Sequence, residues 1–111
     1  MSRNKQKGTS FETLVVEFLK HNGFRYAERR ALTGVNDKGD ITGTPGIVWE
    51  CKNHKTMNLA GWLDETMIET ANADADYGIL VAKRKGKGNA AEQYAVMPLS
   101  MMVELLKAAG Y

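Results

Sequence analysis

The sequence predicts an α/β fold in which a central mixed sheet of about five strands is flanked by helices. Residues 9–22 carry apolar side chains at helical spacing, and residues 77–83 (YGILVAK) have the composition of a buried strand. The expected order of elements is helix, three strands, helix, two strands, helix (α-β-β-β-α-β-β-α). An order that mixes the two element types favours a layered fold with one sheet covered by helices.

The first helix is predicted to begin at Thr9 and to end at residues 22–23 (Asn-Gly), a common helix terminator. Thr9 and Glu12 have the spacing of a T-x-x-E capping box, and bonding the start of the helix would account for Glu12 entirely. Residues 1–8 are basic and polar. We expect them to form a flexible arm ahead of a single domain in residues 9–111.

Three strands are expected after this helix. Residues 24–31 alternate in character and form the first, residues 39–42 begin the second, and residues 47–52 form the third. Between the last two, residues 44–46 (Thr-Pro-Gly) have their proline where a tight turn favours it. Residues 40–52 are therefore predicted to form a hairpin.

A second helix is predicted to begin after Asn58, which can cap it, and to reach about Ala75. The residues expected on its apolar side are Leu59, Trp62, Leu63, Ile68 and Ala71. The strand at 77–83 is followed by a short strand at 93–97. Pro98 then opens a last helix that runs through residue 109, as proline at a first helical position permits.

The composition excludes several classes of protein. No run of about 18 apolar residues is present, so no transmembrane helix and no membrane partner are expected. The basic start of the chain lacks the apolar stretch of a secretory signal. Cys51 is the only cysteine, which rules out an intramolecular disulfide. Together these features predict a cytoplasmic protein.

The strand at 47–52 carries the first candidate for chemistry. Because side chains alternate along a strand, Val48, Glu50 and Lys52 share one face. A carboxylate beside an ammonium on one face also occurs as a simple salt-bridge pattern on exposed strands. The E-x-K pattern alone therefore leaves both interpretations open.

Asp40 adds a second carboxylate on the preceding strand of the predicted hairpin. Pairing around the turn would bring it close to Glu50, and two such oxygen donors suit Mg²⁺. The alternative is that Asp40 is an ordinary turn residue after Gly39. Glu12 lies on the helix face that carries Val15 and should face the sheet. It is a third candidate ligand besides its capping role.

This pattern resembles the PD-(D/E)XK nuclease superfamily, and within it the archaeal and phage Holliday junction resolvases. The matching stretches are residues 8–12 (GTSFE), 39–41 (GDI), 49–52 (WECK), 78–86 (GILVAKRKG) and 94–97 (YAVM). They span nearly the whole chain after residue 7, although each motif is short. Glycine takes the place of proline before the aspartate.

The resemblance implies a restriction-endonuclease-like fold and a metal-dependent phosphodiester hydrolase. Asp40 and Glu50 would bind Mg²⁺, which Mn²⁺ is expected to replace, together with the backbone carbonyl of Cys51. Glu12 would complete the metal shell through water. Lys52 would orient the attacking water and stabilise the charge that develops on phosphate.

Basic side chains are expected to contact the DNA backbone, which supplies affinity without sequence information. They are Arg3, Lys5 and Lys7 in the arm, Arg29 and Arg30 beside the hairpin, Lys55, and Lys83, Arg84, Lys85 and Lys87 in a glycine-rich loop. Thr33 is a weaker candidate in the loop after the first strand, where a hydroxyl can assist the site. The alternative is that these basic residues are ordinary solvated surface charges.

The function expected from these features is a homodimeric Holliday junction resolvase, because a two-fold dimer matches the symmetry of a four-way junction. Three alternatives remain open at this point. The chain is a nuclease or nickase for forks, flaps or duplexes, or a non-catalytic DNA-binding module. The third is a protein-interaction domain that uses the acidic stretch at residues 64–76.

Overall fold

The computed structural model describes residues 3–31 and 37–111. The elements are α1 (Arg3–His21), β1 (Glu28–Arg29), β2 (Ile41–Thr42), β3 (Ile47–Lys52), α2 (Leu59–Asn72), β4 (Tyr77–Ala82), a 3₁₀ turn η1 (Ala90–Glu92), β5 (Tyr94–Val96) and α3 (Leu99–Ala108). This confirms the predicted order of helices and strands, with η1 added before β5.

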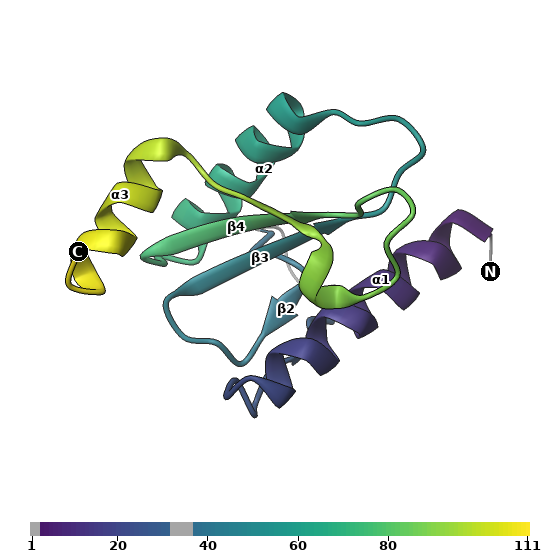
Figure 1. Ribbon diagram of the computed structural model, residues 1–111, viewed down its shortest axis with the longest axis horizontal. Helices are drawn as coiled ribbons and strands as arrows, with labels where there is room; N and C mark the ends of the chain where they lie inside the picture. The colour runs from purple at the N-terminus through teal and green to yellow at the C-terminus, as the bar shows by residue number, and fades with distance from the viewer. Residues whose placement is uncertain (1–2, 32–36) are drawn as a thin grey trace.

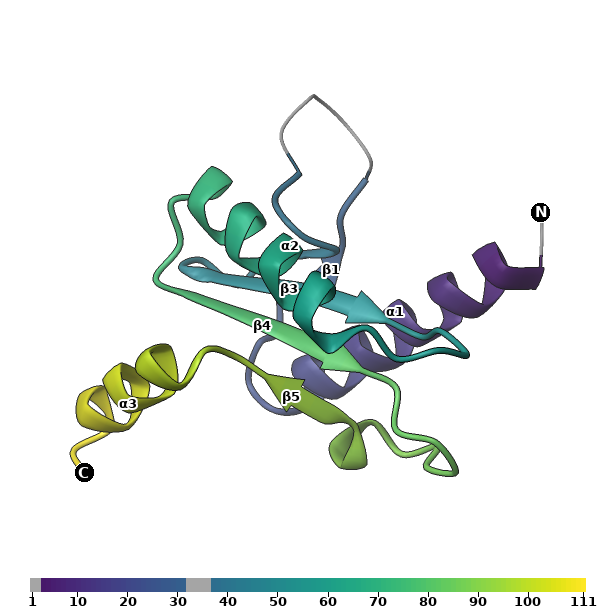
Figure 2. The ribbon, with the colours of Figure 1, turned by 90° about the horizontal axis from the view of Figure 1, so that it is seen from above.

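The strands form two small sheets and not the single sheet that was predicted. One contains β3, β4 and β5, with β3 and β4 parallel and β5 antiparallel to β4. The other is the antiparallel pair β1–β2. Figures 1 and 2 show α1 and α2 on opposite faces of the larger sheet. The result is an α/β domain with a sheet between two helices.

The two sheets stay separate because β2 pairs with β1 and barely reaches β3. The backbone N–H of Asp40 donates to the carbonyl of Trp49 at 2.8 Å, while Ile41 is in register with Arg29 of β1. The predicted turn is present, since the N–H of Ile47 donates to the carbonyl of Thr44 at 3.1 Å. The hairpin prediction is therefore right about the turn but wrong about a continuous ladder.

Helix α1 begins at Arg3, six residues before the predicted start. The flexible arm and the capping box at Thr9 were therefore wrong predictions, because residues 3–8 form the first turns of the helix. Arginine, lysine and glutamine favour helices, and one glycine in a helix interior costs only about 1 kcal/mol. Extending the helix brings Lys7 and Gly8 to the edge of the cavity described below.

Gly39 fixes the backbone that leads into Asp40. Its φ is +97°, a region that proline cannot adopt because its ring holds φ near about −65°. A Cβ at this position would also lie 2.9 Å from the carbonyl oxygen of Trp49. Glycine is therefore required here for the chain to approach β3 closely enough for Asp40 to reach it.

Helix α2 confirms the predicted cap but only part of the predicted apolar side, because Trp62 is buried and Leu63 packs beside it. Asn58 accepts a hydrogen bond from the N–H of Gly61 at 3.2 Å. Leu59, Ile68 and Ala71 are exposed, Ile68 by 63%, while the buried positions are Trp62, Thr66, Glu69 and Thr70. The helix packs closely on Gly78 of β4, where a Cβ would collide with Thr70. Thr66, Glu69 and Thr70 are therefore buried on the same helix as Trp62, while Leu59 and Ile68 face outward.

The remaining elements are shorter or more exposed than predicted. The strand expected at 24–31 is confined to Glu28–Arg29, whereas β4 and β5 lie where they were predicted. Helix α3 follows Pro98 and buries none of its residues, and it extends away from the rest of the molecule in Figure 2. Among the described residues, no helix combines the length and apolar character that crossing a membrane requires.

Candidate functional site

The two faces of β3 have different environments. Trp49 and Cys51 pack with the apolar side chains of α1. Glu50 and Lys52 point to the other face, where Lys52 makes an ion pair with Glu65 of α2. The predicted alternation of side chains is therefore confirmed, and the charged face of the strand lies under α2.

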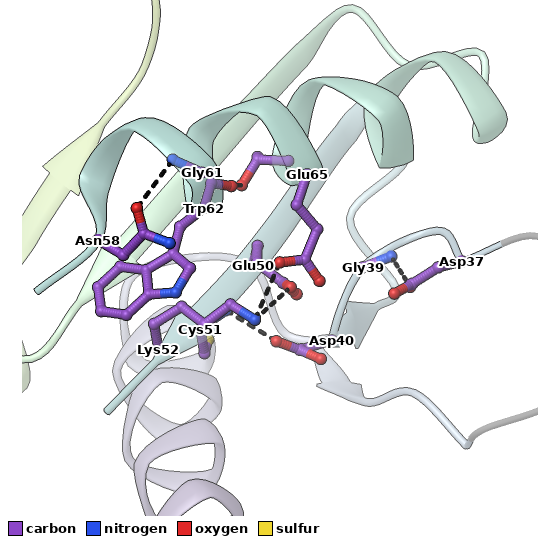
Figure 3. Close-up of polar contacts among 11 residues, drawn as sticks. Asp37, Gly39, Asp40, Glu50, Cys51, Lys52, Asn58, Gly61, Trp62 and Glu65 are labelled. Carbon is purple, nitrogen blue, oxygen red and sulfur yellow. Dashed lines mark hydrogen bonds and ion pairs between the residues drawn. The ribbon is translucent and has the colours of Figure 1, made fainter. Parts of the chain in front are cut away.

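An open cavity of about 600 Å³ lies where the N-terminal half of α1, the end of β3 and the start of α2 approach one another. Asp40, Glu50, Lys52 and Glu12 all line it, so the four residues predicted to be catalytic come together. Figure 3 shows Glu50, Lys52 and Glu65 pointing toward one another, with Asp40 beside the strand.

Asp40 lies at the free edge of β3. Its Oδ2 accepts a hydrogen bond from the backbone N–H of Cys51 at 2.8 Å, which holds the carboxylate beside the strand. Its own backbone is bonded on both sides, to Arg30 and to Trp49. The Asp40 carboxylate is therefore held by main-chain groups and does not move freely as a turn residue would.

Glu50 is buried, with 3% of the residue exposed, and its carboxyl lies near that of Asp40. Burial raises the pKa of Glu50 strongly, and the proximity of Asp40 and Glu69 raises it further. Oε2 contacts Lys52 at 3.3 Å, whereas Oε1 is buried without a hydrogen-bond partner among the described residues. A carboxylate held in this way favours the binding of a cation or a proton.

Lys52 lies between two carboxylates. Its Nζ is 3.3 Å from Oε2 of Glu50 and 3.0 Å from Oε2 of Glu65. Burial alone would lower the pKa of Lys52, but the contacts with Glu65 and Glu50 outweigh it and raise the pKa. The ammonium is thereby fixed as a positive charge at the mouth of the cavity.

Glu12 reaches the site from the opposite face of the sheet. Its Oε1 accepts a hydrogen bond from Nε of Arg29 at 3.0 Å. Burial raises the pKa of Glu12, and the nearby charge of Asp40 raises it further, against the opposing effect of Arg29. Arg29, predicted to contact DNA, is thus engaged with a site carboxylate.

The thiol of Cys51 takes no part in this chemistry. It is buried in the apolar cluster under α1. Burial, and then the charges of Asp40 and Glu12, raise the pKa of the Cys51 thiol above its usual range. A buried neutral thiol is not a nucleophile.

Three carboxylates near the site were missed from the sequence. Asp37, Glu65 and Glu69 place carboxylate oxygens within 4.8 Å of one another and of Glu50, close enough to hold a metal ion. Asp40 is not a member of this group. Burial and the proximity of Asp37 raise the pKa of Glu69, which is 1% exposed.

One pattern in the sequence could have revealed Glu69. Trp62, Thr66 and Glu69 follow one another at intervals of four and three residues, so they share one side of a helix. A tryptophan predicted to be buried therefore places Glu69 on the buried side. The sequence alone did not show which side of α2 is buried, because Leu59 and Ile68 lie on the exposed side.

The basic residues predicted to contact DNA have several different environments. Lys7 and Lys55 line the cavity, and Arg3, Lys5 and Lys85 are exposed. Nζ of Lys83 donates to the carbonyls of Arg84 and Lys87, so it stabilises its own loop. The guanidinium of Arg84 lies 5.9 Å from the centre of the Tyr94 ring.

Arg30 and Thr33 differ from the others. Arg30 is half-buried, and its Nε has no hydrogen-bond partner in the described part of the chain. The structure therefore does not place Arg30 on an open basic surface. Thr33 lies outside the described residues.

The chain matches no protein-family model, no curated protein sequence and no solved structure.

Proposed function

We propose that this protein is a metal-dependent DNA endonuclease of the PD-(D/E)XK type with a restriction-endonuclease-like core. One observation carries the proposal: Asp40, Glu50 and Lys52, which come from two segments of the chain, line one cavity at the edge of β3. The parallel β3–β4 pair, the antiparallel β5 and the helices on opposite faces support the same core.

The residues present fit a divalent cation. Oε1 of Glu50 is buried without a partner in the described ranges, and Asp40 supplies a second carboxylate beside it. Hard cations such as Mg²⁺ prefer carboxylate and carbonyl oxygens. Asp40, Glu50 and the backbone carbonyl of Cys51 would hold the ion, and Glu12 would act from farther out because Arg29 engages it.

Within this site the chain's own residues have separate tasks. A bound Mg²⁺, or Mn²⁺ in its place, would polarise the scissile phosphate and favour hydroxide formation near neutral pH. Lys52 presents a fixed ammonium that attracts the phosphate and stabilises negative charge as it develops. Lys7 and Lys55 line the same cavity and would hold the DNA backbone by charge.

The proposed substrate is a four-way DNA junction, and the proposed active form is a homodimer. A two-fold dimer places identical sites on two opposed strands of such a junction. The exposed apolar side chains of α3 support a second copy as partner, since Leu99 is 79% exposed and Val103 and Leu106 are also exposed. Such a surface is costly to leave in water.

The inward orientation of two acids of α2 weakens the alternative that this helix binds a partner protein through an acidic surface. Glu65 and Glu69 are the two acids of the stretch at 64–76 that belong to the carboxylate group. They are directed toward Glu50 and Lys52 rather than toward a partner protein. The acidic face left for such a partner is correspondingly smaller.

A cleavage assay tests the proposed function. We expect paired, symmetric, Mg²⁺-dependent cuts in a synthetic four-way junction, and roughly hundredfold or greater loss of rate in Glu50→Gln and Lys52→Ala. Glu17→Gln, which changes an exposed carboxylate of α1 outside the cavity, is the matched control and should cut normally. Cutting of forks, flaps or matched duplex with equal rate would reassign the substrate. Binding without cleavage by the wild-type protein would reduce it to a DNA-binding module.

A further inference from the structure

We propose that Glu65 and Glu69 of α2, with Asp37 and Glu50, form a second divalent-cation site on the α2 face of β3, suited to a larger ion such as Ca²⁺. This site shares Glu50 with the proposed nuclease centre but does not include Asp40. It does not require that the protein cut DNA. The four residues are called the α2 carboxylate group below.

Unpartnered buried atoms are the first observation that supports this site. Both carboxylate oxygens of Glu69 and Oε1 of Glu50 are buried without a hydrogen-bond partner in the parts of the chain that the structure describes. Burying an ionised group without a partner is unfavourable. A cation directly bound to these oxygens would remove that cost.

The two threonine hydroxyls beside Glu69 do not donate to it. On the same buried side of α2, the Thr66 hydroxyl donates to the carbonyl of Trp62 at 2.8 Å, and the Thr70 hydroxyl donates to the carbonyl of Thr66 at 2.7 Å. Both hydroxyls are therefore used within the helix. The polar surroundings of Glu69 consist of the other carboxylates of the group.

The spacing of the group suits one ion. Oxygens bound on opposite sides of Ca²⁺, at roughly 2.3–2.6 Å each, stand about 5 Å apart. The four carboxylates place oxygens within 4.8 Å of one another, which is this range. Four carboxylates are more than Mg²⁺ usually takes from a protein, because it keeps several of its waters, whereas Ca²⁺ accepts six to eight oxygens in flexible geometry.

The backbone of Asp37 is hydrogen-bonded to α2, which supports its place in the site. Nδ2 of Asn72 donates to the carbonyl of Asp37 at 2.9 Å. Oδ1 of Asp37 accepts from the N–H of Gly39 at 2.9 Å, which orients the carboxylate. The contact with Asn72 holds Asp37 against the helix that carries Glu65 and Glu69.

Lys52 neutralises only part of the charge. It contacts Oε2 of Glu50 and Oε2 of Glu65, and it leaves the unpartnered oxygens of Glu50 and Glu69 untouched. With all four carboxylates ionised and one ammonium present, the group keeps a formal charge of −3. A divalent cation therefore has both room and electrostatic reason to bind beside Lys52.

Calorimetric titration with CaCl₂, without DNA, tests the site. We expect the wild-type protein to bind one Ca²⁺ at this group and Glu69→Gln to bind it about tenfold or more weakly. Asp40→Asn should retain this binding, since Asp40 is outside the group, and Glu104→Gln on α3 should bind as wild type. If Glu69→Gln fails to fold by circular dichroism, Glu65→Gln replaces it with the same expected loss.

Two results would overturn the proposal. One is equal Ca²⁺ binding by wild type, Glu69→Gln and Glu65→Gln. The other is no Ca²⁺ binding by wild type at millimolar concentrations, which would mean that the carboxyl groups share protons instead. Junction cleavage is measured separately, so a protein that binds Ca²⁺ without cutting keeps this site and loses the nuclease. A protein that cuts the junction but does not bind Ca²⁺ at this group keeps the nuclease function and loses this site.

Discussion

The two faces of β3 pack against different kinds of side chain. Toward α1 the strand meets a cluster of buried apolar side chains that includes Phe11, Val15 and Leu19. On the α2 side a smaller apolar cluster around Trp62 lies beside the buried polar residues Thr66, Glu69 and Thr70, and β3 contributes the buried Glu50. The larger apolar cluster indicates that the α1 face provides the larger share of the folding free energy. The α2 face carries buried charge that is unfavourable without a ligand.

The largest expected effect comes from breaking the α1 face. Leu19→Ala removes a side chain from the apolar cluster and should lower the free energy of unfolding by about 3 kcal/mol. Urea denaturation in EDTA measures it. On the α2 face, Glu50→Gln should leave the same quantity unchanged or higher, because it removes a buried carboxyl whose ionisation is unfavourable. A similar loss in both variants would contradict the comparison.

Adding a divalent cation should stabilise the α2 face by a somewhat smaller amount. A ligand that binds only the folded state at a hundred times its Kd adds about 2.7 kcal/mol. We expect Ca²⁺ or Mn²⁺ to raise the melting temperature of wild type and of Leu19→Ala alike. Glu50→Gln should show little of this increase. An equal increase in Glu50→Gln would place the bound ion elsewhere.

The metal-free protein should lose stability as the pH rises. The pKa values of Glu50 and Glu69 are raised in the folded protein above the ordinary value of 4.5, so ionisation favours the unfolded chain. The stability is complete below that value and is lost as the pH climbs toward the raised pKa values, by at most about 1.4 kcal/mol per pH unit for each group. Urea titrations in EDTA from about pH 5 to about pH 8 measure the slope. A flat profile would argue against buried carboxyls here.

The smallest effect is expected from a single cavity-lining cation. Lys55→Ala should weaken binding to junction DNA a few-fold and reduce the salt slope of log K by about 1. Lys20→Ala on α1, outside the cavity, is the control and should leave both unchanged. Fluorescence anisotropy at several salt concentrations gives the two slopes. Equal slopes for Lys55→Ala and wild type would remove Lys55 from the DNA contact.

Local patterns were sufficient to predict the order of elements and one face of the site. The alternation in residues 47–52 correctly put Glu50 and Lys52 together, and Asn58 correctly marked the start of α2. These features depend on neighbours in the chain. The sheet pairing of β2 depends on β1 and on the backbone at Gly39, which no short pattern specifies.

The carboxylates of α2 show most clearly where sequence reasoning ended. Of the apolar side predicted for this helix, Trp62 and Leu63 pack inward but Leu59 and Ile68 are exposed. The close contact of Thr70 with Gly78 belongs to a packing in which Glu69 is buried. Which side a helix buries is decided by its tertiary partner. Two acids of the stretch at 64–76, Glu65 and Glu69, thereby lie beside Glu50.

A crystal structure of the protein soaked in Mn²⁺ tests the central claim most directly, because manganese is located by its anomalous scattering. The buried carboxylate Glu50 is common to both proposed sites. We expect an anomalous peak from Mn²⁺ within about 2.5 Å of Glu50 Oε1. A structure without such a peak, in which the carboxyls of Glu50 and Glu69 are hydrogen-bonded to their carboxyl neighbours, would contradict it.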